Sequence, residues 1–282
     1  MKKLTIIIAI IVAYLAVVQV VSAQSTIDEL ITVPLSDPGE RGILEIDLVN
    51  GSIEVSGYDG KEVVIKAVSK EGNYEDDDWH HKRDNDDITE KEGLKRIPSN
   101  SMEIEVEERN NKVSVECNSW KQGIDFKVQV PTNFDLQLST VNSGDIAVEN
   151  VNGTMELNNV NGEVTANNVS GSAIIDTVNG KIEASFKSVS GDAPMAFTTL
   201  NGKVDITLPA SVNATFKMKS DRGEIYSDFD MNVDQSGPKV DRSNKGGFKV
   251  TIENWVFGKV NGGGPEFLFN NMNGNIYLRK GK

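Results

Sequence analysis

The residues best suited to metal chemistry gather in one charged segment. Both histidines of the chain, His80 and His81, lie among the acidic residues of positions 75–87. Imidazoles and carboxylates bind zinc or calcium, but zinc needs three or four converging ligands, and the calcium-loop spacing DxDxDG is absent. Adjacent histidines in an extended segment also point to opposite sides. We therefore interpret residues 71–98 as a solvated loop insertion, and as the first candidate for a variable recognition loop.

Carboxylates at regular spacing raise the possibility of glycoside hydrolysis. That reaction needs two carboxyl groups that converge on one bond. The candidate acids alternate with apolar residues and are spread over outward positions of several strands: Glu156, Glu163, Asp176 and Glu183. This spread is typical of a solvated surface. We predict no catalytic residue, no metal ligand and no cofactor, which makes a carbohydrate-active β-helix enzyme the least favoured alternative.

Three tryptophans and one cysteine are the remaining side chains that could bind a ligand or react. Trp79, Trp120 and Trp255 could stack on sugar rings, and an exposed cluster of them would favour glycan binding. Trp255 lies in an apolar run, where packing in the core is the favoured role. Cys117 is the single cysteine, so no intramolecular disulfide can form, and its alternating neighbours predict a small buried side chain.

The elements that position these residues follow a nine-residue repeat. Glycines recur at Gly144, Gly153, Gly162, Gly171 and Gly180, and the last four end Val-Asn-Gly or Val-Ser-Gly triplets. After each glycine the second and fourth residues are apolar and their neighbours are mostly polar, which is the period of a half-buried strand. A fixed short period indicates a repeat architecture. Each unit is predicted to be one strand and one corner.

The corners are predicted from asparagine and glycine, which tolerate positive φ. The structural turn residues are Asn152, Gly153, Asn161, Gly162, Gly171, Asn179, Gly180, Asn201, Gly202, Asn273 and Gly274. Such turns also suit an antiparallel β-meander. A second register of asparagine, at Asn150, Asn159 and Asn168, favours a solenoid, because equivalent asparagines could stack into a ladder. We predict an all-β fold, a β-solenoid or parallel β-helix, with two nine-residue units in each coil and a sheet on each side.

A longer internal repeat surrounds two prolines. Pro131 and Pro209 each end one strand, an alternating strand follows, and a glycine corner comes 13 or 14 residues later, at Gly144 and Gly223. Residues 24–42 are expected to be a loosely ordered N-terminal segment. Residues 43–282 are expected to form a single solenoid domain, with loop insertions at 71–98 and 231–247.

Residues 1–23 are predicted to be an export signal. Lys2 and Lys3 precede an apolar run at 6–18, and small residues allow cleavage between Ala23 and Gln24. The run is shorter than the roughly 20 residues of a membrane-spanning helix, although an uncleaved anchor remains an alternative. We expect no transmembrane segment after signal removal. The location would be the periplasm, the outer cell surface or the medium.

Several separated motifs resemble the bacterial putative-adhesin family, a domain of unknown function in Bacteroidota-type envelope proteins. They are the array from Gly144 to Gly180, Thr199–Asp205, Leu208–Ala210, Gly223–Asp230 and Asn273–Lys280, which together cover roughly residues 43–280. The resemblance implies a β-solenoid-like fold and export. It brings no catalytic residues.

The expected function is binding without catalysis. The net charge of −13 disfavours nucleic acid, whose phosphates would be repelled. Export and the repeat together predict a cell-envelope protein that presents a repetitive β surface to an unknown surface partner, either a glycan or a protein. The alternative is a structural or stress-related envelope component without a discrete ligand.

Overall fold

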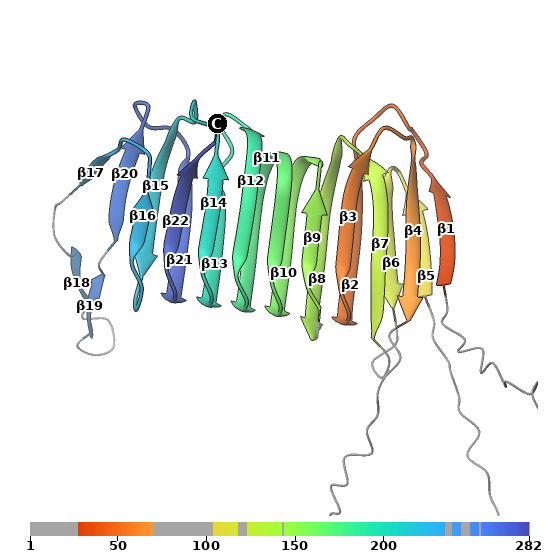
Figure 1. The fold of residues 1–282 in the computed structure, drawn as a ribbon, viewed down its shortest axis with the longest axis horizontal. Coiled ribbons are helices and arrows are strands. Elements are labelled where there is room, and N and C mark those ends of the chain that lie inside the picture. Colours follow the sequence, from red (N-terminus) through yellow and green to blue (C-terminus); the bar gives the residue numbers. More distant parts are fainter. Residues whose placement is uncertain are drawn as a thin grey trace, which may run out of the picture.

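The computed structural model describes residues 28–69, 104–117, 123–142, 144–234, 239–243, 249–253 and 255–281. The predicted signal peptide with Ala23 and Gln24, the loop at 71–98 and Trp120 lie outside the described residues. Within the described residues every regular element is a strand, and 20 of these strands form one sheet. Figure 1 shows them stacked along one long axis, so the prediction of an all-β solenoid is confirmed.

The large sheet folds into two faces, which we name sheet I and sheet II. Sheet I contains, in spatial order, β5 (Ile104–Arg109), β6 (Lys112–Cys117), β2 (Gly42–Asn50), β8 (Phe134–Asn142), β10 (Asn152–Asn161), the second half of β11 (Val164–Asn179), β13 (Met195–Asn201), β21 (Glu266–Asn273), β15 (Ala214–Ser220), β20 (Val256–Val260) and β17 (Asn232–Asp234).

Sheet II begins at the same end of the molecule. It contains, in spatial order, β1 (Asp28–Pro34), β4 (Glu62–Ser69), β7 (Ile124–Pro131), β3 (Ile53–Tyr58), β9 (Ile146–Glu149), the first half of β11, β12 (Ile182–Val189), β14 (Val204–Leu208), β22 (Ile276–Lys280) and β16 (Ile225–Ser227). A separate hairpin joins β18 (Lys239–Ser243) and β19 (Lys249–Glu253).

The central coils repeat every 18 residues. On sheet II Ile146 pairs with Val164, and Val164 pairs with Ile182. On sheet I Met155 pairs with Ala173 in the same parallel register. Each coil therefore contains two nine-residue units, one strand in each sheet, as predicted.

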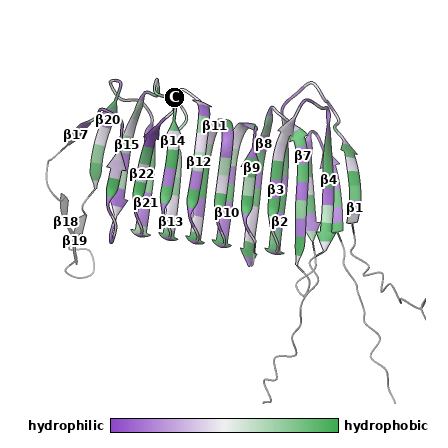
Figure 2. Cartoon of the chain, in the orientation of Figure 1, coloured by the Kyte–Doolittle hydropathy of each residue, from purple (hydrophilic) through white to green (hydrophobic). Residues whose placement is uncertain are grey.

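The hydrophobic core lies between the two sheets. Alternate side chains of each strand point inward, and Figure 2 shows the resulting bands of hydrophobic and hydrophilic residues. Phe197 and Phe269 stack with ring centroids 5.1 Å apart, and Phe216 meets Phe269 edge to face at 5.8 Å. Burying one such ring contributes about 1.5–3 kcal/mol. Because the inward residues stabilise the fold, the outward ones are available for surface chemistry.

The coils are not stacked in sequence order, which the sequence analysis did not predict. The coil of β2 and β3 lies between the coils β6–β7 and β8–β9. The coil of β21 and β22 lies between β13–β14 and β15–β16. Each inserted coil fills the position skipped after Pro131 or Pro209. The longer internal repeat thus marks two places where the chain advances by two coils along the axis.

Antiparallel strands close the two ends of the solenoid, and some strands lie in segments that were expected to be irregular. Residues 24–42, expected to be loosely ordered, contain β1, which pairs with β4 and buries Val33. Residues 231–247, expected to be a loop insertion, contain β17 and β18. The last strand of a sheet exposes unpaired N–H and C=O groups, so a nearby extended segment can add to it without a repeat pattern of its own.

Candidate binding groove on sheet I

A column of glycines forms the corner that leads from sheet I to sheet II. Its members are Gly51, Gly144, Gly162, Gly180, Gly202, Gly274 and Gly223. A Cβ added to Gly180 would lie 1.9 Å from the carbonyl oxygen of Gly162, and one added to Gly202 would lie 2.1 Å from that of Gly180. Successive coils approach so closely at this corner that no side chain fits between them.

Backbone conformation divides the predicted turn residues into two groups. Gly171, Gly202 and Gly274 have positive φ values of 110°, 149° and 148°, a region that favours glycine. The other predicted turn residues are not among those with positive φ, namely Asn152, Gly153, Asn161, Gly162, Asn179, Gly180, Asn201 and Asn273. Their glycines are explained by the close stacking of backbone on backbone, with Gly153 packed on the carbonyl of Phe134 at the opposite corner.

Four of the turn asparagines form a ladder of side-chain hydrogen bonds, the asparagine ladder. Asn179 Nδ2 donates to Asn161 Oδ1 at 2.9 Å, and Asn201 Nδ2 donates to Asn179 Oδ1 at 2.7 Å. Asn273 Nδ2 continues it by donating to Asn201 Oδ1 at 2.7 Å. Asn152 lies apart, and its Nδ2 donates to Asn133 Oδ1 at 2.7 Å. The ladder fixes the height of each strand end on sheet I.

The second asparagine register divides between the two corners. Asn150 and Asn168 have positive φ, and Asn168 Nδ2 donates to Asn150 Oδ1, as a ladder requires. Asn159 is buried at the other corner, where its Nδ2 donates to the carbonyl of Gly144 at 3.0 Å. Thr177 makes the equivalent bond to the carbonyl of Gly162 at 3.0 Å. Unlike the threonine, Asn159 also carries an Oδ1 atom, which is buried without a hydrogen-bond partner.

A row of exposed apolar side chains precedes the asparagine ladder, and we name it the apolar ridge. Its members are Val141, Val160, Val178, Leu200 and Met272, each 37–41 % exposed. They occupy equivalent positions on neighbouring strands, because each directly precedes an asparagine whose register is shared. Val151 and Val169, from the same sequence triplets, are buried at the opposite corner. Outward apolar residues in a continuous row mark a candidate interaction surface.

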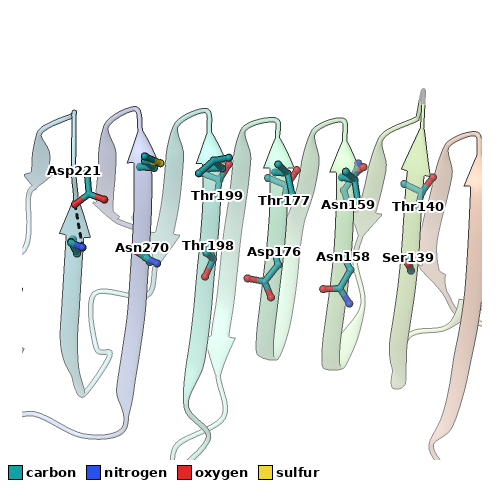
Figure 3. A pocket seen from close by; sticks show the side chains of 15 residues that line it. Ser139, Thr140, Asn158, Asn159, Asp176, Thr177, Thr198, Thr199, Asp221 and Asn270 are labelled. Carbon is teal, nitrogen blue, oxygen red and sulfur yellow. Dashed lines mark ion pairs between the residues drawn. The ribbon is translucent and has the colours of Figure 1, made fainter. Parts of the chain in front are cut away.

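A parallel row of hydrophilic side chains lies beside the apolar ridge, and we name it the polar row. Figure 3 shows its members on five neighbouring strands: Ser139, Asn158, Asp176, Thr198 and Asn270. Ridge and row line a shallow groove of about 680 Å³. Among the described residues, the side chains of Ser139, Asn158 and Asn270 make no hydrogen bond or ion pair. Their donors and acceptors are therefore available to a partner.

Asp176 supplies the only carboxylate in the polar row. Burial raises its pKa above the usual range, although a hydrogen bond with Thr198 opposes this shift and the nearby charge of Glu156 adds to it. The carboxylate thus lies in a partly desolvated position, and no cation contributes to the shift of its pKa. An environment of this kind favours neutral hydrogen-bonding groups over further charge.

One end of the groove carries opposite charges and an aromatic ring. Lys219 Nζ lies 3.2 Å from Asp221 Oδ1, and the two residues close the row beyond Asn270. Trp255 is half-buried, with Lys217 Nζ 4.8 Å and Lys219 Nζ 5.8 Å from its ring centroid. Lysine side chains lie over the ring, and Trp255 is not among the residues of the hydrophobic core, where packing was expected to place it.

Sheet II presents a different surface, a network of ion pairs. Lys181 Nζ lies 3.0 Å from Glu163 and 3.2 Å from Glu183. Arg279 donates two hydrogen bonds to Asp205, of 2.6 and 3.0 Å. The hydrogen bond from Lys203 lowers the pKa of Glu183, and that from Arg279 lowers the pKa of Asp205. These carboxylates are occupied by partners of the same face.

Sequence reasoning missed the groove because it treated all nine-residue units as equivalent. The valine before each Asn-Gly pair was available as a signal, since two such valines lie 18 residues apart at Val160 and Val178. Reading the repeat with the 18-residue period places them on one row of sheet I. Cys117 is half-buried and packs against the core.

The described part of the chain contains no cluster of three or more His, Cys, Asp or Glu side chains placed to hold a metal ion. It also contains no helix with the length and apolarity needed to cross a membrane.

The chain is similar to one protein family and to solved structures of other proteins. Residues 125–254 match the family model described as Toastrack DUF4097, a β-solenoid-like fold, which confirms the resemblance to a repeat family of unknown function. A solved structure described as a putative cell adhesion protein from Clostridium sporogenes shares 12% identity, with 91% of this chain and 100% of that chain covered and a TM-score of 0.49.

A second solved structure is described as a putative adhesin from Bacteroides fragilis. It shares 12% identity, with 89% of this chain and 97% of that chain covered and a TM-score of 0.27. The search of curated proteins found no match.

Proposed function

We propose that this protein is an exported, non-enzymatic envelope protein of the adhesin type, which binds an extended partner on sheet I. The observation that carries the proposal is the apolar ridge beside the polar row, in which Ser139, Asn158 and Asn270 have no partner among the described residues, along the groove of about 680 Å³. A row of outward apolar residues favours association with a partner over contact with water alone. Parallel rows on a solenoid suit a long ligand, because every coil offers one polar and one apolar side chain at equivalent positions.

Non-enzymatic binding also fits the use of the acidic residues. Glu163 and Glu183 bind lysines of sheet II, and Asp176 lies on the opposite face of the solenoid. Glycoside hydrolysis would need two carboxyl groups on either side of one bond. The distribution of these three acids supports surface solvation and structural ion pairing instead.

A second candidate function is that of a structural envelope component without a discrete ligand. The glycine column, the asparagine ladder and the ion pairs of sheet II favour it, since together they make a rigid rod that needs no partner. The two functions differ in whether the outer face is reachable from outside the cell and whether it captures anything.

Protease shaving of intact cells tests the proposal. We expect the protein to be cut together with outer-surface controls, while a periplasmic control stays protected. Full protection of the protein would overturn the adhesin function and leave the structural alternative. Purified protein on glycan and protein arrays then separates a binder from an inert scaffold, because a scaffold would capture neither.

A further inference from the structure

The geometry points to an extended, uncharged oligosaccharide as the ligand of the groove, and we propose that it lies along the solenoid axis with one sugar ring on each strand. This inference rests on the proposed binding function and names its site and ligand class. The site consists of the polar row and the apolar ridge on β8, β10, β11, β13 and β21.

The first argument is the period of the surface. Neighbouring strands lie about 4.8 Å apart, so equivalent side chains of ridge and row repeat at that distance along the axis. This spacing is close to the length of one pyranose ring in a β-1,4-linked chain. An extended peptide presents side chains on one face only every ~6.7 Å, so it would fall out of register within two or three strands.

The second argument is the chemistry across the groove. A pyranose ring has an apolar C–H face and a rim of hydroxyl groups, and the groove pairs an apolar line with a line of amides, hydroxyls and one carboxylate. Asn158 and Asn270 can each donate and accept hydrogen bonds, as can Ser139. Side chains of this kind can bind hydroxyl groups, whereas phosphate or carboxylate ligands would need cations. The one lysine lining the groove, Lys219, already pairs with Asp221.

The third argument is the unsatisfied carbonyl of Asn159. This side chain lines the groove, is 4 % exposed, and bonds the glycine corner through Nδ2 while its Oδ1 has no partner. Thr140, Thr177 and Thr199 hold the equivalent corners through a hydroxyl and leave no buried acceptor. Asn271 on β21 bonds the carbonyl of Gly202 as Asn159 bonds that of Gly144, and its Oδ1 is likewise buried without a partner. An unpaired buried acceptor lowers stability, so two such acceptors on strands that carry the groove fit carbonyls kept for ligand hydroxyls.

Chain length provides the direct test. Binding of the full chain to β-1,4-linked glucose and N-acetylglucosamine oligomers of two to eight units would be measured by calorimetry. We expect affinity to rise with each added ring until the oligomer spans the five strands, and then to level off. An affinity that is independent of length, or no binding by either series, would overturn the proposal for this ligand class.

Two variants place the ligand in the groove. Val178→Glu puts a charge in the apolar ridge and is expected to weaken binding at least about tenfold, since the charge would be desolvated under the ligand. Leu30→Glu is the matched control, because Leu30 is an exposed apolar residue on sheet II, and it should leave affinity unchanged. Equal effects of the two variants on affinity would contradict binding of the ligand on sheet I.

Asn159→Thr separates binding from folding. Threonine can make the corner hydrogen bond without a buried unpaired acceptor, so we expect Tm to rise by about 2–4 °C while affinity for the longest oligomer falls severalfold. A rise in Tm with unchanged affinity would contradict the role of Asn159 in binding. If shaving shows surface exposure but the protein captures only other proteins on the arrays, the glycan inference fails and the proposed binding function stands.

Discussion

The two faces of the solenoid use polar residues in opposite ways. On sheet II, outward acids and bases alternate between neighbouring strands and satisfy one another, as in the chain from Glu163 through Lys181 to Glu183. On sheet I, between β8 and β21, uncharged polar side chains stand in register next to exposed apolar ones. Sheet II therefore completes these interactions within the chain, whereas the groove of sheet I leaves several of them open.

The contrast between the two sheets indicates where function can reside in a fold of nearly identical repeats. Surface ion pairs contribute little each, but a network holds long side chains in fixed positions and reduces their availability to a partner. A row of amides and hydroxyls beside an apolar ridge has the reverse property. Substitutions can either break the corner that both faces share or compare matched residues on the two faces.

The largest effect is expected at the glycine column, which joins the faces. In Gly180→Ala the new methyl group would lie 1.9 Å from the carbonyl oxygen of Gly162, so both adjacent coils must shift. We expect a loss of about 3 kcal/mol or more in the free energy of unfolding, measured by urea denaturation. Gly191→Ala is the matched control, because nothing lies within 4 Å of its added Cβ. Similar losses for the two variants would mean that close stacking is not what requires glycine.

The next largest effect is expected for the ion-pair face. Asp205→Asn removes the charge that binds Arg279 and Lys203, and should lower stability at pH 7 by about 1–2 kcal/mol. The hydrogen bond from Arg279 holds the pKa of Asp205 below its ordinary value in the folded protein. Its stabilisation is therefore present above the unfolded pKa of about 3.9 and is lost as the pH falls through the folded pKa. Urea denaturation from pH 7 to pH 3 should show the variant and the parent converging, and a constant difference would contradict the assignment.

A smaller effect is expected for the asparagine ladder. Asn179→Ala removes one hydrogen bond to Asn161 and one from Asn201, both at an exposed position, and should cost about 1 kcal/mol. Asn158→Ala is the matched control on the same sheet, because the Asn158 side chain has no hydrogen bond among the described residues. We expect thermal denaturation to leave the control within about 0.5 kcal/mol of the parent. A control as damaging as Asn179→Ala would show that the polar row is structural.

The sequence predicted the periodic middle of the fold well. Alternation after each glycine identified the strands, and their uniform spacing identified coils of two units, because both signals are local consequences of a half-buried strand. The exchange of coil order could not be predicted. β2 pairs with β8 and β21 pairs with β13, strands that lie far away in the chain. The edges of these strands offer the same backbone pairing as those of strands nearby in the sequence. Nothing in a repeat motif distinguishes one repeat partner from another.

The candidate groove was less accessible from the sequence for a related reason. Val151 and Val160 stand in the same Val-Asn-Gly context, yet the first is buried and the second is exposed. The two valines differ in exposure because they lie at different corners of the coil. Val151 follows a strand of sheet II, and Val160 lies at the end of a strand of sheet I. The turn glycines were predicted from their tolerance of positive φ, whereas most of them pack against the backbone of a neighbouring coil. That contact is a property of the stack and not of a single turn.

The smallest effect concerns Asp176 and has the opposite sign from that of Asp205. Burial raises the pKa of Asp176 in the folded protein, so its ionised form carries a cost at neutral pH, and this cost disappears as the pH falls through the folded pKa toward the unfolded one. Asp176→Asn should therefore raise stability at pH 7 by less than about 1 kcal/mol and have no effect at pH 3. The measurement is urea denaturation at both pH values, in parallel with Asp205→Asn. If both variants lost stability at pH 7, Asp176 would belong to a structural network like that of sheet II. A gain for Asp176 beside a loss for Asp205 would instead show that sheet I keeps a carboxylate at the expense of stability, as a binding surface does.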